Sequence, residues 1–371
     1  MTIRVPFLDL RINDQSELDL IHQAMDIVFR HGKLVMGPEI DHFESRVAQH
    51  CGRKYCVSVA SGTDALFIAL KALRIGPGDE VITTSLSWIA TANAIALTGA
   101  TPVFADILDD LNICPLSVEE LITPRTRAVL AVDYTGQICD MEALEAICKN
   151  HHLHLIEDGS QAFGASRNGR LCGSFGVVSA ISHNPMKVFA ALGEAGSILC
   201  DDKDLYERLV MLRYNGTINR ETCIEPSLNG RMDTLHAAVL LRRLEQLPEL
   251  IRRRRQNACY YAKHLTGLLQ LPTEDQQNQP VYYTYTIQTD HRDALEQHLA
   301  EHGIETKVQH RLLMPEHPAY KASVRGNYTK ALEISKKILS IPVHEKLTNE
   351  QLAHVVHAIH AFPADPQTPH C

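Results

Sequence analysis

The stretch AISHNPMKVFAALGEAGS, from Ala180 to Ser197, contains a single lysine, Lys187, in a loop between two apolar segments. The preceding segment VVSAIS (177–182) and the following segment AGSILCD (195–201) both have the composition of buried β-strands. Most lysines lie in solvent, but this one follows a buried-looking strand and stands between Ser182 and the turn LGEAG (192–196). The stretch therefore predicts a strand–loop–strand unit with a candidate functional side chain.

These two strands belong to a longer alternation of strands and helices. Helical patterns cover residues 14–31, 62–73, 89–99 and 141–151, and strand patterns cover 54–60, 79–85, 101–107, 126–134 and 153–159. Strands such as RAVLAVDY (127–134) are nearly continuous apolar runs, which is typical of parallel strands covered on both faces. We predict an α/β fold with a mostly parallel central sheet and helices on both faces.

The pattern changes after about residue 204, where helical segments dominate. An amphipathic run over 233–247 is interrupted by Pro248, and a strand over 281–288 and a helix over 292–304 follow. We predict a large α/β domain over residues 1–245, which includes the N-terminal segment, and a smaller C-terminal α+β domain over residues 246–371. The run Arg252–Arg255 points in four directions on a helix and predicts a solvated surface.

Composition narrows the class of protein. The net charge of −8 argues against nucleic acid and anionic membranes as partners. The N-terminus is too polar for a signal peptide, and no apolar run reaches the about 18 residues that a membrane helix needs. The ten cysteines occur singly, without CxxC pairs or zinc-finger spacing, and Cys371 is expected to be exposed. We predict reduced thiols, no metal site and a cytoplasmic location.

The segment VASGTDALF (59–67) reads as strand, short loop and helix, with Ser61, Gly62 and Thr63 at the junction. A helix N-terminus offers free N–H groups and a positive dipole end, Gly62 allows close approach, and the hydroxyls add hydrogen bonds, which suits a phosphate. Because Ser, Thr and Asp are also common N-caps, the same residues are compatible with a helix start that binds nothing.

Further side chains follow other strands at the same expected sheet edge, where ligands of open α/β sheets bind. Asp158 ends an apolar strand and is either a partner for a ring N–H⁺ or a loop-starting cap. Ser182 precedes Lys187, and Trp88, the only tryptophan, either stacks on a ring or packs in the core or an interface. An amine, a carboxylate and a phosphate cup are the groups that pyridoxal phosphate requires.

The chain resembles the DegT/DnrJ/EryC1/StrS family of sugar aminotransferases over nearly its whole length. The resemblance rests on residues 37–107 and on the segments DYTGQICDMEAL (133–144), HLIEDGSQAFGA (154–165), SHNPMKVFAALGEAGSIL (182–199), NGRMDTLHAAVLLRRLEQL (229–247) and LSIPVHEKLTNEQ (339–351). It implies a fold type I pyridoxal phosphate enzyme that acts as a homodimer with shared active sites. It also implies amination of a nucleotide-linked keto-deoxysugar, with glutamate as the expected amino donor.

The resemblance assigns roles to individual residues. Lys187 resembles the Schiff-base lysine, Asp158 the partner of the pyridine nitrogen, and Gln161 the group near the ring hydroxyl. Gly62, Thr63 and Ser182 resemble the phosphate cup beside Ser61, Trp88 takes the place of the stacking aromatic residue, and Asn229 resembles an asparagine that reaches a phosphate in the neighbouring subunit.

Several residues depart from the family pattern. Ala195 stands where glycine is usual, Ser160 and Phe163 stand where alanine and histidine are commoner, and His183 and His236 occupy positions usually held by other residues. The alternatives are another fold type I enzyme, such as a desulfurase or aldolase, or a non-catalytic regulatory protein. The intact set of Lys187, Asp158 and Ser182 argues against the regulatory protein, and NGRMDTL (229–235) slightly favours a 3-keto sugar over a 4-keto sugar.

Overall fold

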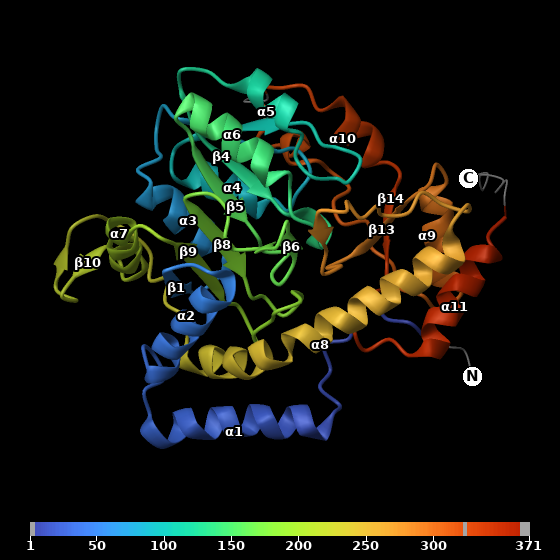
Figure 1. The fold of residues 1–371 in the computed structure, drawn as a ribbon, viewed down its shortest axis with the longest axis horizontal. Coiled ribbons are helices and arrows are strands. Elements are labelled where there is room, and N and C mark those ends of the chain that lie inside the picture. The colour runs from blue at the N-terminus through green and yellow to red at the C-terminus, as the bar shows by residue number, and fades with distance from the viewer. Residues whose placement is uncertain (1–3, 322–324, 364–371) are drawn as a thin grey trace.

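A seven-stranded sheet lies at the centre of the computed structural model, which describes residues 4–321 and 325–363 (Figure 1). In spatial order its strands are β1 (Tyr55–Val59), β9 (Gly196–Cys200), β8 (Val178–Ser182), β5 (His154–Asp158), β4 (Thr126–Val132), β2 (Glu80–Thr84) and β3 (Thr101–Ala105). Neighbouring strands are parallel except β9, which is antiparallel to both β1 and β8. The predicted α/β fold with a mostly parallel sheet is confirmed.

The two faces of the sheet carry separate hydrophobic cores, because successive side chains of a strand point to opposite faces. In β4, Val129 and Ala131 pack into one core, and Ala128 and Leu130 pack into the other. The first core is covered by α2 (Pro38–Cys51), α5 (Pro115–Leu121), α6 (Met141–His151) and part of α8 (Thr234–Leu265), the second by α3 (Gly62–Ala72), α4 (Ala90–Leu97) and α7 (Lys203–Arg213).

The long helix α8 runs through both parts of the molecule. Leu244 and Leu247 pack in the core of the large sheet, whereas Ala258 and Tyr261 pack in a third core that contains the C-terminal elements. Pro248 does not end the helix, contrary to the sequence-based expectation, because each half is held by its own core. A proline still removes one helical hydrogen bond, and Figure 1 shows the helix bending near its middle. The predicted boundary near residue 245 falls inside this helix.

The smaller part combines a two-stranded antiparallel sheet with helices. Its elements are β13 (Tyr285–Gln288), β14 (Ile338–Ile341), α9 (Arg292–Glu301), α10 (Thr329–Ile334) and α11 (Asn349–His360). Arg254 of α8 is 3% exposed and pairs with Glu345 (2.8 Å), so the prediction of a solvated surface for the arginine run is wrong at this position. The reason is tertiary: the Arg254 side chain donates to Glu345 and to the backbone carbonyl of Tyr282, which belong to the smaller part of the molecule.

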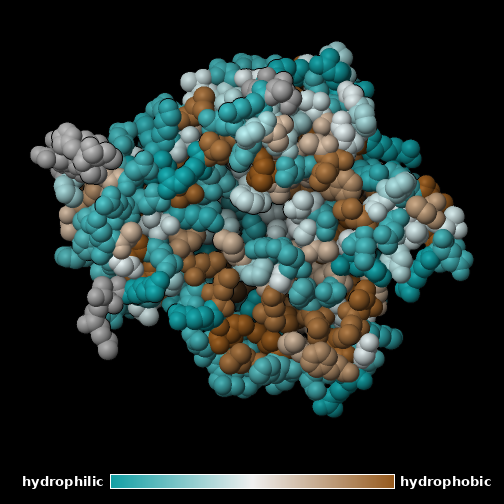
Figure 2. All heavy atoms as spheres, turned by 180° about the vertical axis from the view of Figure 1, so that it is seen from behind, coloured by the Kyte–Doolittle hydropathy of each residue, from teal (hydrophilic) through white to brown (hydrophobic). Residues whose placement is uncertain are grey.

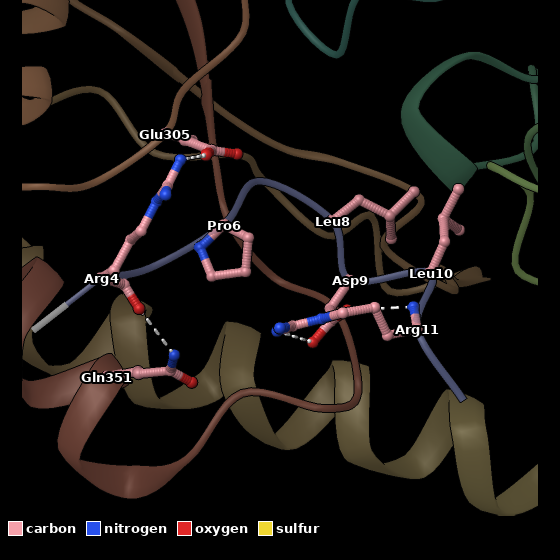
Figure 3. A pocket seen from close by; sticks show the side chains of 8 residues that line it. All are labelled: Arg4, Pro6, Leu8, Asp9, Leu10, Arg11, Glu305 and Gln351. Carbon is pink, nitrogen blue, oxygen red and sulfur yellow. Dashed lines mark hydrogen bonds and ion pairs between the residues drawn. The ribbon is translucent and has the colours of Figure 1, made fainter. Parts of the chain in front are cut away.

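The N-terminal segment crosses the smaller part rather than the large sheet (Figure 3). Val5 is fully buried in the C-terminal core and bridges to Ile304, although the sequence placed it with the larger domain. Arg4 pairs with Glu305 (3.2 Å), and Arg11 pairs with Asp9 (2.8 Å). Because the charged groups of this open groove bind one another, we infer no ligand site there.

Apart from the 17-residue helix α1, the remaining elements are short. They comprise α1 (Gln15–His31), β6 (Ser166–Arg167), β7 (Arg170–Leu171), β12 (Asn278–Gln279) and the hairpin of β10 (Thr217–Ile218) and β11 (Thr222–Cys223), which projects beside α7 in Figure 1. The nine cysteines in the described ranges are all free, and Cys371 lies outside these ranges. Among the described helices, none combines the length and apolar composition needed to cross a membrane.

Candidate active site

The predicted site residues meet at the carboxyl edge of the parallel strands. Val132 of β4 pairs in register with Asp158 of β5, and Ser182 ends the neighbouring strand β8. A cavity of about 570 Å³ opens at this edge, where open α/β sheets bind ligands. Its lining includes the predicted residues Ser61, Gly62, Thr63, Trp88, Asp158, Gln161, Ser182 and Lys187, and of the predicted set only Asn229 is not part of it.

The N-terminus of α3 and the end of β8 form the part of the cavity predicted to hold a phosphate. Ser61 is the N-cap of α3, and its Oγ accepts a hydrogen bond from the Asp64 N–H (3.0 Å). The N–H groups of Gly62 and Thr63 have no acceptor in the part of the chain that the structure describes. They are therefore available to an anion at the positive end of the helix, so the Ser61 cap is compatible with the predicted phosphate site.

Gly62 is required because the start of α3 packs tightly against the end of β8. A Cβ at this position would lie 2.5 Å from Cβ of Ser182, a separation that side chains do not tolerate. Gly196 is equally constrained, since its Cβ would lie 2.4 Å from the Ser61 carbonyl oxygen. Gly196 pairs with both Val59 and Ser182 at the start of β9. These two glycines bring the α3 N-terminus and the Ser182 hydroxyl to the same point.

Asp158 is a buried carboxylate at the end of β5, with 4% of its surface exposed. The Ser160 N–H donates to Oδ1 (3.2 Å), and Thr91 Oγ1 donates to Oδ2 (3.4 Å). Burial raises the pKa of Asp158, and the hydrogen bonds from Ser160 and the charge of Lys187 partly oppose this shift. A buried carboxylate of this kind is stabilised by a cationic N–H donor, such as a protonated pyridine nitrogen.

The loop that carries Lys187 is shaped by Asn184. The Lys187 N–H donates to the Asn184 carbonyl (2.8 Å), and the Met186 N–H donates to Asn184 Oδ1 (2.9 Å). The side chain of Lys187 reaches the cavity, where its Nζ lies 4.7 Å from the centroid of the Tyr283 ring. The lysine is therefore held by backbone contacts at one end and by an aromatic ring at the other.

His183 anchors the same loop from inside the core. Its Nε2 lies 2.9 Å from Ser197 Oγ, and its Nδ1 lies 3.3 Å from the Phe189 carbonyl oxygen. Since a carbonyl only accepts, Nδ1 carries the proton, and Nε2 accepts from the Ser197 hydroxyl. Burial lowers the pKa of His183 to about 3, so the ring stays neutral in ordinary buffers. Ala195 is buried, and its backbone carbonyl accepts a hydrogen bond from the backbone N–H of His183 (2.7 Å).

The other departures from the family pattern also have local explanations. Phe163 stacks on Phe189 (4.8 Å between ring centroids) and meets the His183 ring edge-on (5.9 Å). Ser160 donates its backbone N–H to Asp158, and a side-chain hydrogen bond from Ser160 also lowers the pKa of that carboxyl group. His236 lies against Gly193, where an added Cβ would come within 3.1 Å of its Nε2. These contacts place the unusual residues in the support of the site.

Gln161 and Trp88 occupy different walls of the cavity. Gln161 Oε1 accepts from the Thr135 N–H (2.9 Å), which leaves its Nε2 as the donor for a ligand. Trp88 is 62% exposed, and its ring lies 6.2 Å from that of His310. Trp88 is therefore not a core residue. The two predicted roles that its exposure allows are stacking on a ligand and packing in an interface with a partner chain.

One wall of the cavity consists of residues that the sequence analysis missed. Tyr283, Lys307, Gln309 and His310 line it from the C-terminal part of the chain. They lie far from the other site residues in sequence and form no motif of their own, so no local signal identified them. Burial lowers the pKa of His310 to about 3, helped by the charges of Lys307 and Lys187, and its imidazole is neutral.

Asn229 does not line the cavity of its own chain. Its Oδ1 accepts from Arg231 Nε (2.7 Å), and its backbone bridges to Tyr214 beside the projecting hairpin. The predicted role of Asn229 in the site of a neighbouring subunit stays a prediction.

Two buried acidic residues lie beside Asp158 without lining the cavity: Glu157 precedes it in β5, and the Asp133 N–H donates to its backbone carbonyl (3.0 Å). Glu157 accepts from the N–H groups of Gly173 (2.9 Å) and Phe175 (3.1 Å) and from Ser179 Oγ (2.6 Å). Burial and the charge of Glu157 raise the pKa of Asp133 well above its usual range. With Cys172, these side chains form the one group in the described ranges whose spacing could suit a metal. Their protein hydrogen bonds give them a structural role.

A sheet of this strand order, with a lysine loop and a buried carboxylate at its carboxyl edge, has the architecture of a fold type I pyridoxal phosphate enzyme. The chain belongs to the DegT/DnrJ/EryC1/StrS aminotransferase family, whose model matches residues 15–360. This is a family of sugar-nucleotide transaminases, so the enzyme class expected from the sequence is confirmed.

Two relatives cover nearly the whole chain. The dTDP-3-amino-3,6-dideoxy-alpha-D-galactopyranose transaminase of Aneurinibacillus thermoaerophilus is 37% identical over 95% of this chain and 98% of its own length. The dTDP-3-amino-3,4,6-trideoxy-alpha-D-glucose transaminase of Streptomyces venezuelae is 38% identical over 96% of this chain and 95% of its own length.

Solved structures agree with this assignment. The crystal structure of S. venezuelae DesV in complex with a ketimine intermediate has a TM-score of 0.95 at 36% identity, covering 99% of this chain and 100% of that one. The structure of NtdA from Bacillus subtilis with bound cofactor PMP has a TM-score of 0.89 at 28% identity, covering 96% of this chain and 84% of that one.

Proposed function

We propose that this chain is a pyridoxal phosphate-dependent aminotransferase that aminates the keto group of a nucleotide-linked deoxysugar, with glutamate as the amino donor. The observation that carries the proposal is the single cavity lined by Lys187, Asp158 and the free N–H groups at the start of α3. These are an amine, a buried carboxylate and an anion site at one sheet edge, which matches the aldehyde, the ring nitrogen and the phosphate of the cofactor.

The names of two relatives support a position for the new amine. Both relatives described above are named for 3-amino sugars carried by dTDP. We therefore propose a 3-keto sugar nucleotide as the substrate. The nine free cysteines support a cytoplasmic enzyme.

The bound cofactor would supply an electron sink for the carbanion formed when the donor loses its Cα proton. Lys187 Nζ would hold the cofactor aldehyde covalently and, once displaced by the donor amine, would move a proton as a general base. Asp158 would accept a hydrogen bond from the ring N–H and keep that nitrogen protonated. Gln161 Nε2 would donate to a ring substituent, because its Oε1 is occupied by the Thr135 N–H.

We also propose that two chains share their active sites. Figure 2 shows hydrophobic side chains gathered at the end of the molecule where α1 lies. The exposed large apolar residues there include Ile27, Phe29, Leu34 and Val35. Such a patch is typical of a protein interface. The position of Asn229, outside its own cavity and beside a projecting hairpin, supports its use in a partner's site.

Lys187→Ala tests the chemistry. Borohydride reduction of the cofactor-loaded wild type should attach the reduced cofactor to the peptide that contains Lys187, and the variant should lose both this label and turnover while keeping its thermal unfolding transition. A label on another lysine would overturn the assignment.

A panel of 3-keto and 4-keto sugar nucleotides, each offered with the dTDP and UDP carriers, then tests the substrate. Amination of only the 4-keto sugars would overturn the proposed position.

A further inference from the structure

The cavity contains very little positive charge. Its lining has two carboxylates, Asp158 and Glu194, and two ammonium side chains, Lys187 and Lys307, but no arginine. His310 also lines it, but burial keeps that imidazole neutral. An anionic substrate that enters this cavity therefore has few cations from this chain to bind.

The backbone of Lys307 is hydrogen-bonded in place at this wall. Its N–H donates to the Ser340 carbonyl (3.0 Å), and its own carbonyl accepts from the Ser340 N–H (2.9 Å), so it is fixed to the edge strand β14. The Lys307 ammonium forms no ion pair or side-chain hydrogen bond with any residue that the structure describes, whereas Lys330 and Lys337 nearby in the sequence both pair with acids. A half-buried ammonium that lacks an acidic partner gains from an anionic ligand.

In the proposed chemistry, Lys307 is the cation of this cavity that is free to bind the carboxylate of the amino-acid donor. Lys187 has to act as a neutral base, so it is not the counter-ion of a substrate. The anion site at the start of α3 and Ser182 is matched to the cofactor phosphate and belongs to the large domain. An amino-acid donor brings a carboxylate into a cavity that already contains Asp158 and Glu194, and this carboxylate requires a cation.

We propose that Lys307 binds a carboxylate of the amino-acid donor and thereby sets the affinity of the donor half-reaction. This inference rests on the proposed aminotransferase function. Lys307 is a specificity residue: it contacts the donor, and the acceptor sugar of the second half-reaction does not need it.

The test compares three variants of the cofactor-loaded protein. Lys307→Gln removes the charge, Lys307→Arg keeps it, and Lys336→Gln changes an exposed lysine of the same region as a matched control. The Kd of glutarate, a dicarboxylate without an amine, is measured by calorimetry, and the KM for L-glutamate is measured in the isolated half-reaction. A charge-assisted hydrogen bond predicts that Lys307→Gln raises both constants by about 10-fold to 100-fold. Lys307→Arg should recover most of the loss, and Lys336→Gln should match the wild type.

A second arm separates the possible sources of the carboxylate. Binding of UDP-glucose and UDP-glucuronate is compared in the wild type and in Lys307→Gln. The proposal expects both nucleotide sugars to keep their affinity. If Lys307→Gln loses only UDP-glucuronate binding and keeps glutarate binding, Lys307 binds the carboxylate of an acidic sugar, and the donor assignment is wrong. Glutarate binding that is undetectable, or that does not depend on Lys307, would also overturn the donor assignment. Failure of the function itself would appear separately, as no labelling of Lys187 and no half-reaction with any amino acid.

Discussion

The Nζ atom of Lys187 lies 4.7 Å from the centroid of the Tyr283 ring, and this contact joins the loop after β8 to the C-terminal part of the chain. The lysine is therefore positioned by residues that lie about a hundred positions apart in the sequence. A cation over an aromatic face is stabilised by about 0.5–2 kcal/mol, depending on burial.

Removing this ring should weaken cofactor binding. Tyr283→Leu should raise the Kd of pyridoxal phosphate by up to about 10-fold, because the lysine side chain loses the surface that holds it. Tyr283→Phe keeps the ring and should stay within about twofold of the wild type. Fluorescence titration of cofactor-free protein gives both values. If Phe loses as much as Leu, the hydroxyl and not the ring positions Lys187.

Asp158→Asn should slow the donor half-reaction without preventing cofactor binding. The neutral amide cannot hold the ring nitrogen protonated, and losses of such electrostatic stabilisation cost about 10²–10³ in rate. Stopped-flow absorbance with L-glutamate measures the rate, and a titration shows that the cofactor still binds. A variant with a near-normal rate would show that Asp158 only caps its strand.

Asp133→Asn should be tolerated and should change the pH dependence of stability. The pKa of Asp133 is raised in the folded protein, so the folded state keeps its proton to higher pH than the unfolded state does. Its contribution to the free energy of unfolding therefore falls as pH rises from about 4 through the folded-state pKa. Asparagine still accepts from the Cys139 N–H (2.9 Å in the wild type) and cannot ionise, so this fall should disappear.

Urea unfolding of wild type and Asp133→Asn between pH 4 and pH 8 measures this effect. In the matched variant Glu157→Gln the free energy of unfolding should fall by about 1–3 kcal/mol. Glu157 accepts hydrogen bonds from Gly173, Phe175 and Ser179 with both of its oxygens, and an amide has only one oxygen to accept them. A steeper loss of stability at high pH in Asp133→Asn would contradict the protonated state of Asp133.

Asn229 should complete the site of a partner chain. Chains with Lys187→Ala are mixed with chains with Asn229→Ala and allowed to exchange. In a mixed dimer one site carries both defects and the other carries neither. Half of the dimers should be mixed with one intact site each, so activity should recover to about a quarter of the wild type under two-fold symmetry.

This experiment requires that Asn229→Ala be impaired by itself at limiting cofactor concentration. Native mass spectrometry confirms that the chains have exchanged. Exchange without recovery above the parent proteins would place the action of Asn229 within its own chain and rule out the shared site.

The sequence determined the sheet and most of its edge. The strand pattern over 153–159 and the helical pattern over 141–151 correspond to β5 and α6, because continuous apolar runs and a helical period are local properties. Parallel strands present their carboxyl ends at one edge. The sequence alone therefore predicts that Asp158, Ser182 and the start of α3 are neighbours.

The tertiary structure decided everything that depends on how the C-terminal part folds back. Tyr283, Lys307 and His310 reach the cavity only because β13 and β14 and the segments beside them pack against the sheet edge, and no local pattern records such a long-range contact. Pro248 reads as a break in the sequence, yet cores on both sides hold α8 together. Arg254 is buried while Arg252 is solvated, because burial depends on which neighbour a helix face meets. Local chemistry thus fixed the elements, and the packing between distant segments fixed the wall that closes over Lys187.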